Sequence, residues 1–389
     1  MLVPKPMSDA KALLDPRGTE DDLPVSGGSG VTVDDPTGAL PAQSAGEADL
    51  SEAQRDAAPA PAAEISTERE RDLRKKSSNP FVAVLQWFDT TARDAQDEGG
   101  FGGRQKVEWV RLVPFGILHL SCLAVLWVGW SPVAVGVAVA MYAVRMFAIT
   151  GFYHRYFSHR TFKTTRFGQF MFGLIGSTAT QRGPLWWAAH HRDHHKHSDE
   201  VEDVHSPKQH GFWWSHMGWV TCKANFPTKL ENVRDLARFP ELRFLDRFDT
   251  LVPILTGAAM FFLGMALDAL WPSLGTSAGQ MLVWGYFVST VFLLHGTFTI
   301  NSLSHVFGSQ RYETGDTSRN NPLLALITLG EGWHNNHHYY QSSARNGFYW
   351  WEYDLTYYGL KVLSWLGIVW DLRPVPARVR DARPQRRQR

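Results

Sequence analysis

The sequence predicts an all-α integral membrane protein in which four transmembrane helices lie beneath a cytoplasmic helical cap. The first observation behind this prediction is a set of four apolar stretches, at residues 112–130, about 133–152, 251–271 and 281–300. Each approaches the roughly 20 residues that a helix needs to cross the hydrocarbon core of a bilayer. The second observation is that basic residues avoid two of the connections between these stretches. A soluble protein with four buried helices is the alternative.

The placement of the basic residues predicts the orientation in the membrane. If all four stretches cross, residues 131–132 and 272–280 form the loops on one side, and neither contains Lys or Arg. Every other basic residue except Arg145 then falls on the opposite side. The positive-inside rule therefore places both termini and the loop 153–250 in the cytoplasm, in a multi-pass protein of the cell membrane. A fifth apolar stretch, 167–179, is too short to span and is expected to be re-entrant or part of the core.

The chain is predicted to contain one membrane domain, residues 79–372, between two tails. Residues 1–78 contain no Phe, Trp or Tyr and are rich in Pro, Ala, Gly, Ser, Asp and Glu. Such a segment cannot bury enough apolar surface to offset its ordering entropy, so we expect a disordered N-terminal tail. Residues 373–389 form a basic C-terminal tail. The net charge of +1 argues against a nucleic-acid binder, and a total of two cysteines excludes a disulfide framework.

Histidine is the residue whose distribution needs explaining, since fifteen of sixteen lie between His154 and His338. Eight of them form three clusters, HRYFSH at 154–159, HRDHH at 191–195 and HNNHH at 334–338. Positions i, i+3 and i+4 lie on one face of a helix, so each HxxHH motif is expected to present three imidazoles to one point. The HxxxxH spacing fits one helical face less well. We therefore expect its two histidines to lie on either side of a helix end or bulge.

These clusters indicate a site for two metal ions in the cap. One zinc ion takes four ligands and would leave half of the eight imidazoles unused, whereas two ions with four or five ligands each use the whole set. Imidazole suits Fe, Cu, Zn and Ni, so the ligand type alone does not identify the metal. His305, just after the fourth apolar stretch, is a ninth candidate. Asn301, one helical turn before it, could hydrogen-bond a metal-bound water.

The other histidines are not expected to be metal ligands. His190 and His197 adjoin the second cluster and are expected to contact the ligands or face solvent. Four more, isolated in the sequence, are expected to be hydrogen-bonding interface residues: His119, His210, His216 and His295.

The order HRYFSH, HRDHH, NSLSH and HNNHH resembles the membrane fatty acyl desaturases, and in particular Δ9 acyl-CoA (stearoyl-CoA) desaturases of the bacterial type, over residues 80–372. The HxxxxH spacing of the first motif, the extended second motif HRDHHKHSDEVEDVHSP and the stretch GEGWHNNHH carry the resemblance. The stretch before the first motif, AITGFYH, follows the family's glycine pattern only loosely. The resemblance implies a di-iron centre in which Asn301 holds a water on one iron. The implied iron ligands are His154, His159, His191, His194, His195, His305, His334, His337 and His338.

The resemblance implies an O2-dependent enzyme that introduces a cis double bond into a saturated long-chain fatty acyl group, with acyl-CoA as the expected carrier and Δ9 as the expected position. Acid–base side chains cannot remove hydrogen from an unactivated methylene, which has no acidic proton, whereas iron with dioxygen can. Two other interpretations stay open. One is a related membrane di-iron fatty acyl or lipid hydroxylase, and the other is a non-enzymatic membrane receptor that contains zinc.

The resemblance also suggests substrate contacts. Gln181 and Arg182 lie where the family contacts the substrate head group, and the Arg182 guanidinium could meet a phosphate. Trp187, four residues before His191, matches a tryptophan that precedes the second motif in the family. Further candidates for the wall of an acyl tunnel are Trp186, Phe170, Phe172 and Phe298.

The two electrons that the reaction needs are expected to come from another protein. The sequence contains no Rossmann glycine fingerprint, no cysteine-ligated iron–sulfur motif and no haem module resembling a cytochrome. A separate ferredoxin or flavoprotein reductase is therefore the expected donor, docking on the cytoplasmic face.

Overall fold

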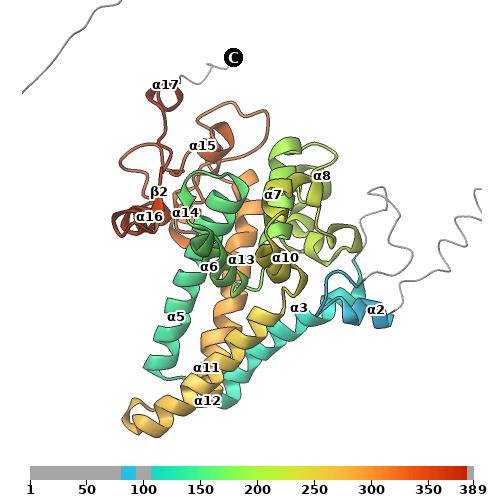
Figure 1. The fold of residues 1–389 in the computed structure, drawn as a ribbon, viewed down its shortest axis with the longest axis vertical. Helices are drawn as coiled ribbons and strands as arrows, with labels where there is room; N and C mark the ends of the chain where they lie inside the picture. Colours follow the sequence, from blue (N-terminus) through green and yellow to red (C-terminus); the bar gives the residue numbers. More distant parts are fainter. Residues whose placement is uncertain (1–79, 93–106, 383–389) are drawn as a thin grey trace, which may run out of the picture. The chain divides into compact units, whose positions relative to one another are not determined.

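The computed structural model describes residues 80–92 and 107–382, which all belong to one compact unit (Figure 1). The predicted N-terminal tail lies outside the described residues. Of the predicted C-terminal tail, the described part includes the short helix α17 (Ala377–Arg380). Within these residues the regular structure is helical apart from one antiparallel pair, in which β1 (Lys163–Thr164) pairs with β2 (Val369–Trp370). The predicted all-α class is confirmed.

In the part of the chain that the structure describes, three helical segments are long and apolar enough to cross a membrane, namely Pro132–Ser158, Leu251–Leu270 and Ala278–His305. The first consists of α5 (Pro132–Phe147) and the π-helix η3 (Ala148–Ser158), and the second is α11 (Leu251–Leu270). The third runs through α12 (Ala278–Leu282), η9 (Val283–Val288), α13 (Ser289–Asn301) and η10 (Leu303–His305). Large apolar side chains such as Leu255 and Phe262 of α11 are exposed on the protein, as expected of helices that lipid surrounds.

The first apolar stretch forms a helical segment whose apolar part is shorter than those of the other three. It comprises α3 (Trp109–Ser121), the 3-10 turn η2 (Cys122–Ala124) and α4 (Val125–Val128), and its apolar part is Leu112–Val128. Gly129, with φ of +66°, ends the segment, and Ser131 caps α5 by accepting a hydrogen bond from the Ala134 amide at 3.1 Å. Three of the four predicted spans therefore reach the length of a membrane helix in the structure.

Several of the remaining helices form the histidine-bearing end of the unit, which α5 and α13 enter from below in Figure 1. All the remaining helices in the described residues are α2 (Pro80–Leu85), α6 (Arg166–Ser177), α7 (Pro184–His197), α8 (Pro207–His210), η4 (Trp214–Gly218), η5 (Trp219–Thr221), η6 (Lys223–Asn225), η7 (Leu230–Val233), α9 (Arg234–Ala237), α10 (Pro240–Arg247), η8 (Pro272–Leu274), α14 (Pro322–Ile327), α15 (His334–Tyr339) and α16 (Leu355–Trp365).

Helix α6 corresponds to the fifth apolar stretch and is part of the core. Its Phe172 stacks on Phe152 of η3 with ring centroids 3.9 Å apart. Gly176 is required at this contact, because a Cβ there would come within 2.1 Å of the Tyr153 ring. The stretch thus packs against η3, which carries the first histidine motif.

Helix α7, which carries the second histidine motif, is fixed at its start by a residue from another helix. Pro184 occupies the first turn, and the Trp186 amide in that turn donates a 2.7 Å hydrogen bond to Asp246 of α10. A carboxylate at a helix N-terminus satisfies an otherwise unpaired amide and interacts favourably with the helix dipole. Gly183 lets α10 approach, since a Cβ there would lie 2.4 Å from the Asp246 Cα.

Candidate metal centre

All nine histidines singled out in the sequence gather in two adjacent groups. The five-histidine cluster consists of His154, His159, His191, His195 and His337. The four-histidine cluster consists of His194, His305, His334 and His338. In each group, one ring nitrogen of every member lies within 4.8 Å of those of the others. Four chain segments, at the ends of η3 and η10 and in α7 and α15, therefore meet at one place.

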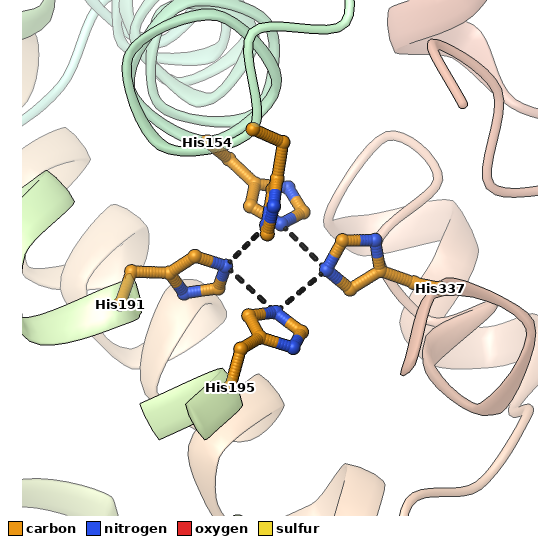
Figure 2. A group of neighbouring side chains, drawn as sticks. His154, His191, His195 and His337 are labelled. Atoms are coloured by element: carbon orange, nitrogen blue, oxygen red, sulfur yellow. Dashed lines mark hydrogen bonds between the residues drawn. The ribbon is translucent and has the colours of Figure 1, made fainter. Parts of the chain in front are cut away.

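The five-histidine cluster has the spacing of ligands around one ion. The His159 and His191 Nε2 atoms are 2.8 Å apart, and His195 Nε2 lies 3.0 Å from His191 Nε2 and 2.9 Å from His337 Nε2. His154 Nε2 lies 3.0 Å from His337 Nε2. Figure 2 shows the rings of His154, His191, His195 and His337 turned toward one shared point. Two nitrogens that each lie about 2.1 Å from one ion at a right angle are about 3.0 Å apart.

The two HxxHH motifs are divided between the clusters, which differs from the expectation that each presents three imidazoles to one point. In α7, His191 and His195 belong to the five-histidine cluster, whereas His194 belongs to the four-histidine cluster. In α15 the division is reversed, because His334 and His338 lie in the four-histidine cluster and His337 in the other. The i and i+4 side chains share a cluster, and the i+3 side chain turns to its neighbour. Each helix therefore supplies both clusters.

The first histidine motif lies at a helix irregularity, as its spacing predicted. The π-helix η3 ends at Ser158, with His154 inside it and His159 directly after it. The wider turn of a π-helix brings residues five apart close together along one side. The rings of His154 and His159 are consequently 4.9 Å apart, centroid to centroid.

Four carboxylates bind the outward-facing nitrogens of the histidines. The Nδ1 atoms of His194 and His338 lie 2.9 Å from Asp203 and 2.6 Å from Asp316. Similar contacts join His154 Nδ1 to Glu331 at 2.7 Å and His305 Nδ1 to Asp199 at 3.5 Å. A carboxylate at Nδ1 keeps the proton on that nitrogen and leaves the Nε2 lone pair free for a metal.

Glu331 is itself held from two further sides. The buried Arg155 guanidinium donates to one of its oxygens at 2.9 Å, and the Asn346 amide donates to the other at 2.8 Å. Arg155 also forms an ion pair with buried Asp354 at 2.9 Å. This network fixes the carboxylate that orients His154.

Sequence reasoning missed these four carboxylates and His205. Asp199 and Asp203 lie in the extended second motif and Glu331 three residues before the third, so acidic residues beside the histidines were an available signal. Asp316 has no such signal. His205, to which the sequence assigned no role, has its Nδ1 3.0 Å from Asp203 and forms a third group with that residue and His194.

The electrostatics of the site suit two divalent cations. Burial, with the neighbouring imidazoles, lowers the pKa of His159, His191, His195, His334 and His337 well below the usual range. Burial lowers the pKa of His338 to about 4. The four carboxylates behave oppositely, because contacts with their histidine partners outweigh burial and hold each pKa below its usual range. The imidazoles whose pKa is lowered stay neutral beside four ionised carboxylates, a negative charge that two divalent ions would balance, so the residues fit such a pair.

A cavity of about 260 Å³ adjoins both clusters. Its wall contains the imidazoles of His154, His191, His194 and His334, and the side chain of Asn301. It also contains apolar side chains of the membrane helices, namely Phe115, Leu118, Met146, Ile149, Leu294 and Phe298. The histidine clusters therefore face a space in which apolar atoms predominate.

Five of the proposed substrate-contacting residues line this cavity: Gln181, Arg182, Trp186, Trp187 and Phe298. The Gln181 amide donates to Thr297 at 2.9 Å, and the Trp187 indole donates to Gln181 at 3.4 Å. Phe170 and Phe172, the other two candidates, do not line this cavity. Phe172 lies in the core against Phe152, since α6 turns that face toward η3.

Arg182 already has partners within the protein. Its guanidinium forms an ion pair with the buried carboxylate of Asp249 and donates to the Phe226 carbonyl at 3.3 Å. It also lies over the Phe226 ring, 3.8 Å from the centroid. Its charge is therefore balanced by Asp249 at the cavity wall.

Comparison with known proteins agrees with this geometry. The model of the fatty acid desaturase family matches residues 128–363. The chain is 35% identical over 273 residues to the sn-1 stearoyl-lipid 9-desaturase of Anabaena variabilis. That alignment covers 69% of this chain and 95% of the Anabaena protein. The chain is 38% identical over 274 residues to the sn-1 stearoyl-lipid 9-desaturase of Synechocystis sp., covering 69% and 81%. It is also 36% identical over 289 residues to the acyl-CoA 5-desaturase of Anemone leveillei, covering 71% and 85%. These matches confirm the resemblance carried by the histidine motifs, and the chain belongs to the fatty acid desaturase family.

Proposed function

We propose that this protein uses dioxygen and a histidine-ligated di-iron centre to introduce a cis double bond at the Δ9 position of a saturated long-chain fatty acyl group. The observation that carries the proposal is the pair of histidine clusters beside an apolar cavity. The Δ9 position is supported by the names of the relatives in Anabaena variabilis and Synechocystis sp.. The balanced reaction consumes O2, two electrons and two protons, and it yields the alkene and two molecules of water.

The five-histidine cluster would hold one iron and the four-histidine cluster the other, with Asn301 hydrogen-bonded to a water on the second. When bound, the two irons supply the capacity to reduce dioxygen and remove two hydrogens from adjacent unactivated carbons. The carboxylates Asp199, Asp203, Asp316 and Glu331 orient the imidazoles and balance the charge of the ions.

The cavity residues would choose the carbon that reacts. A saturated chain has no polar group near the reacting carbons, so its position depends on how far it enters an apolar space of fixed depth. Trp187 stacks on His191 with ring centroids 4.9 Å apart, so it borders both the cavity and the five-histidine cluster. The indole would hold the acyl chain beside the ions and exclude water from that place.

Two acyl carriers are candidates. Acyl-CoA is the carrier implied by the motif resemblance, and it is the substrate named for the Anemone relative. An acyl-lipid is favoured by the names of the Anabaena and Synechocystis relatives and by the cavity itself. The cavity lining contains one arginine and no lysine, and that arginine is paired with Asp249. A chain that enters from a membrane lipid needs no phosphate-binding cation at this wall.

Fatty-acid profiling of a host that expresses the chain tests the function. We expect new monounsaturated acids two hydrogens lighter than their precursors, with the double bond at carbon 9 and two irons per purified chain. Products heavier by one oxygen would establish the hydroxylase instead, and zinc without product the receptor. Supplying labelled acyl-CoA or labelled acyl-lipid to isolated membranes distinguishes the two carriers.

An external electron donor is part of the proposal. A second cavity, of about 380 Å³, is lined by polar side chains that include His159 and His195 of the five-histidine cluster and the exposed Lys196. A ferredoxin or flavoprotein reductase that docks over this cavity would lie close to one iron, separated from it by the histidines that bind that iron. The exposed cation suits a donor with an acidic surface.

The proposed membrane arrangement keeps four spans and a cytoplasmic site. The apolar part of the first segment, Leu112–Val128, would be about 25 Å long at the rise of a helix, and its 17 residues lie at the lower end of the range that spans a bilayer. We expect tags at both termini to be cleaved by protease only from the cytoplasmic side of sealed vesicles. A tag inserted at Gly275, where the connection between α11 and α12 has open space, serves as the control and should be cleaved only from the other side. Termini on opposite faces would refute this arrangement.

A further inference from the structure

Three histidines outside the two clusters form a continuous chain of hydrogen bonds, which we call the histidine chain. His119 of α3 and His295 of α13 meet through their Nε2 atoms at 3.0 Å. The other nitrogen of His295, Nδ1, lies 3.0 Å from Nε2 of His216 in η4. The sequence predicted interface histidines at these positions, and the structure shows that the three bind one another.

The Phe115 end of the histidine chain fixes the direction of the hydrogen bonds between its rings. His119 Nδ1 lies 2.7 Å from the Phe115 carbonyl, which can only accept, so His119 donates through Nδ1. A neutral His119 must then accept at Nε2, which makes His295 the donor through Nε2 and an acceptor at Nδ1. His295 Nδ1 then accepts from Nε2 of His216. His216 Nδ1 lies 2.9 Å from the Ser302 hydroxyl, which donates its hydrogen to the Phe298 carbonyl.

This arrangement excludes two other roles for the histidine chain. A shared metal ion would need one nitrogen from each ring directed at one point, but His295 uses opposite nitrogens for its two neighbours. A path for protons would need an acceptor at the far end that can pass the proton on. The Phe115 carbonyl accepts a hydrogen bond and goes no further.

The histidine chain instead connects the wall of the substrate cavity to the end of α13. Phe115 and Phe298 both line the cavity, and the rings of His216 and His295 lie 5.8 and 6.0 Å from the Phe298 ring, centroid to centroid. At the other end, His216 binds Ser302, and its neighbour Ser215 donates to the Asn301 carbonyl at 2.8 Å. Both contacts hold the last residue of α13 and the residue that follows.

We propose that the histidine chain is a positioning device that sets Asn301 and the segment leading to His305 against the acyl cavity. The proposal rests on the proposed function, because Asn301 matters only if it holds a water on one iron. Three elements far apart in the sequence, α3, η4 and α13, are braced by one series of bonds. The histidine chain thereby fixes the side of the four-histidine cluster that faces the substrate.

His295→Leu tests the proposal, because it leaves the Nε2 atoms of His119 and His216 without their partner. We expect the purified variant to keep two irons, and the Mössbauer spectrum to change for one iron and not for the other. We expect kcat to fall about tenfold with KM within about twofold, and fewer double bonds to form per electron consumed. His295→Gln retains one donor and one acceptor. It should recover part of the coupling, which is the number of double bonds formed per electron consumed.

His197→Gln is the matched control, since this partly exposed histidine of α7 lies outside both clusters and the histidine chain. If His295→Leu yields too little folded protein, Ser302→Ala removes the hydroxyl that contacts His216 Nδ1 at nearly unchanged volume and should shift the same signals by a smaller amount. Wild-type iron spectra and wild-type coupling in these variants would overturn the proposal, as would loss of both irons. If wild-type protein makes no alkene, the proposed function fails, while the iron spectra still report on the positioning.

Discussion

Alanine in place of His191, His195, His334 or His337 is expected to abolish formation of the double bond. Each of these imidazoles has a nitrogen within 4.8 Å of those of its cluster, so each substitution opens a coordination position. Replacing even an outer partner of a metal ligand typically costs 10–100-fold in metal affinity or activity. Removal of a ligand itself should therefore reduce product by at least about a hundredfold. Iron per chain, measured by atomic emission, should fall together with product.

Two substitutions in the same helix serve as controls for these variants. Asp193 lies between His191 and His194, but its carboxylate is turned to Lys229 and Asn232 and away from both clusters. Asp193→Asn and His197→Ala should keep their iron and most of their activity. A His337→Ala protein that still held two irons and made product would show that the clusters are not the di-iron site.

Asp316→Asn is expected to weaken iron binding by about 10–100-fold while leaving the fold intact. One oxygen of this carboxylate accepts from the Ser318 amide and the Thr314 hydroxyl, and the other contacts His338 Nδ1 at 2.6 Å. The amide preserves the shape but removes the negative charge that favours the Nδ1–H form of His338 and balances the ion. The affinity is measured by titrating the metal-depleted protein with Fe²⁺ in the absence of oxygen.

Asp371→Asn provides the comparison, because Asp371 is an exposed carboxylate paired with Lys163 at 2.8 Å. It carries the same change of charge at a distance from any histidine contact and should bind iron as the wild type does. Equal affinity in the two variants would mean that Asp316 does not tune the site.

The sequence predicted the membership of the site better than its geometry. Spacings of three and four residues place side chains on one helical face, so the HxxHH motifs could be recognised without any structure. Those spacings do not say which neighbouring segment each ring meets, and His194 turns to a different cluster from His191 and His195. Asp316 was invisible for a similar reason, since it reaches His338 across 22 positions of a connection without periodicity.

The aromatic residues illustrate the same limit. Trp186 and Trp187 line the cavity because α7 also carries ligands, so their positions follow from the histidine motif. Phe172 lies on a helix with no such anchor, and the packing of α6 on η3 decided its place. The membrane helices were predicted from composition alone, and the apolar part of the first is shorter in the structure than those of the other three.

The distances along the chain between the members of one cluster give the metal a role in holding the protein together. His154 and His337 are neighbours in the five-histidine cluster although 183 positions separate them. An ion bound there would close a very long loop. Without the ion, the protein must bear the entropic cost of closing that loop with no metal bonds to offset it. Because only the folded form assembles such a site, binding shifts the folding equilibrium by mass action. Iron supply would thus govern how much of this enzyme a cell contains, in addition to how fast each copy works.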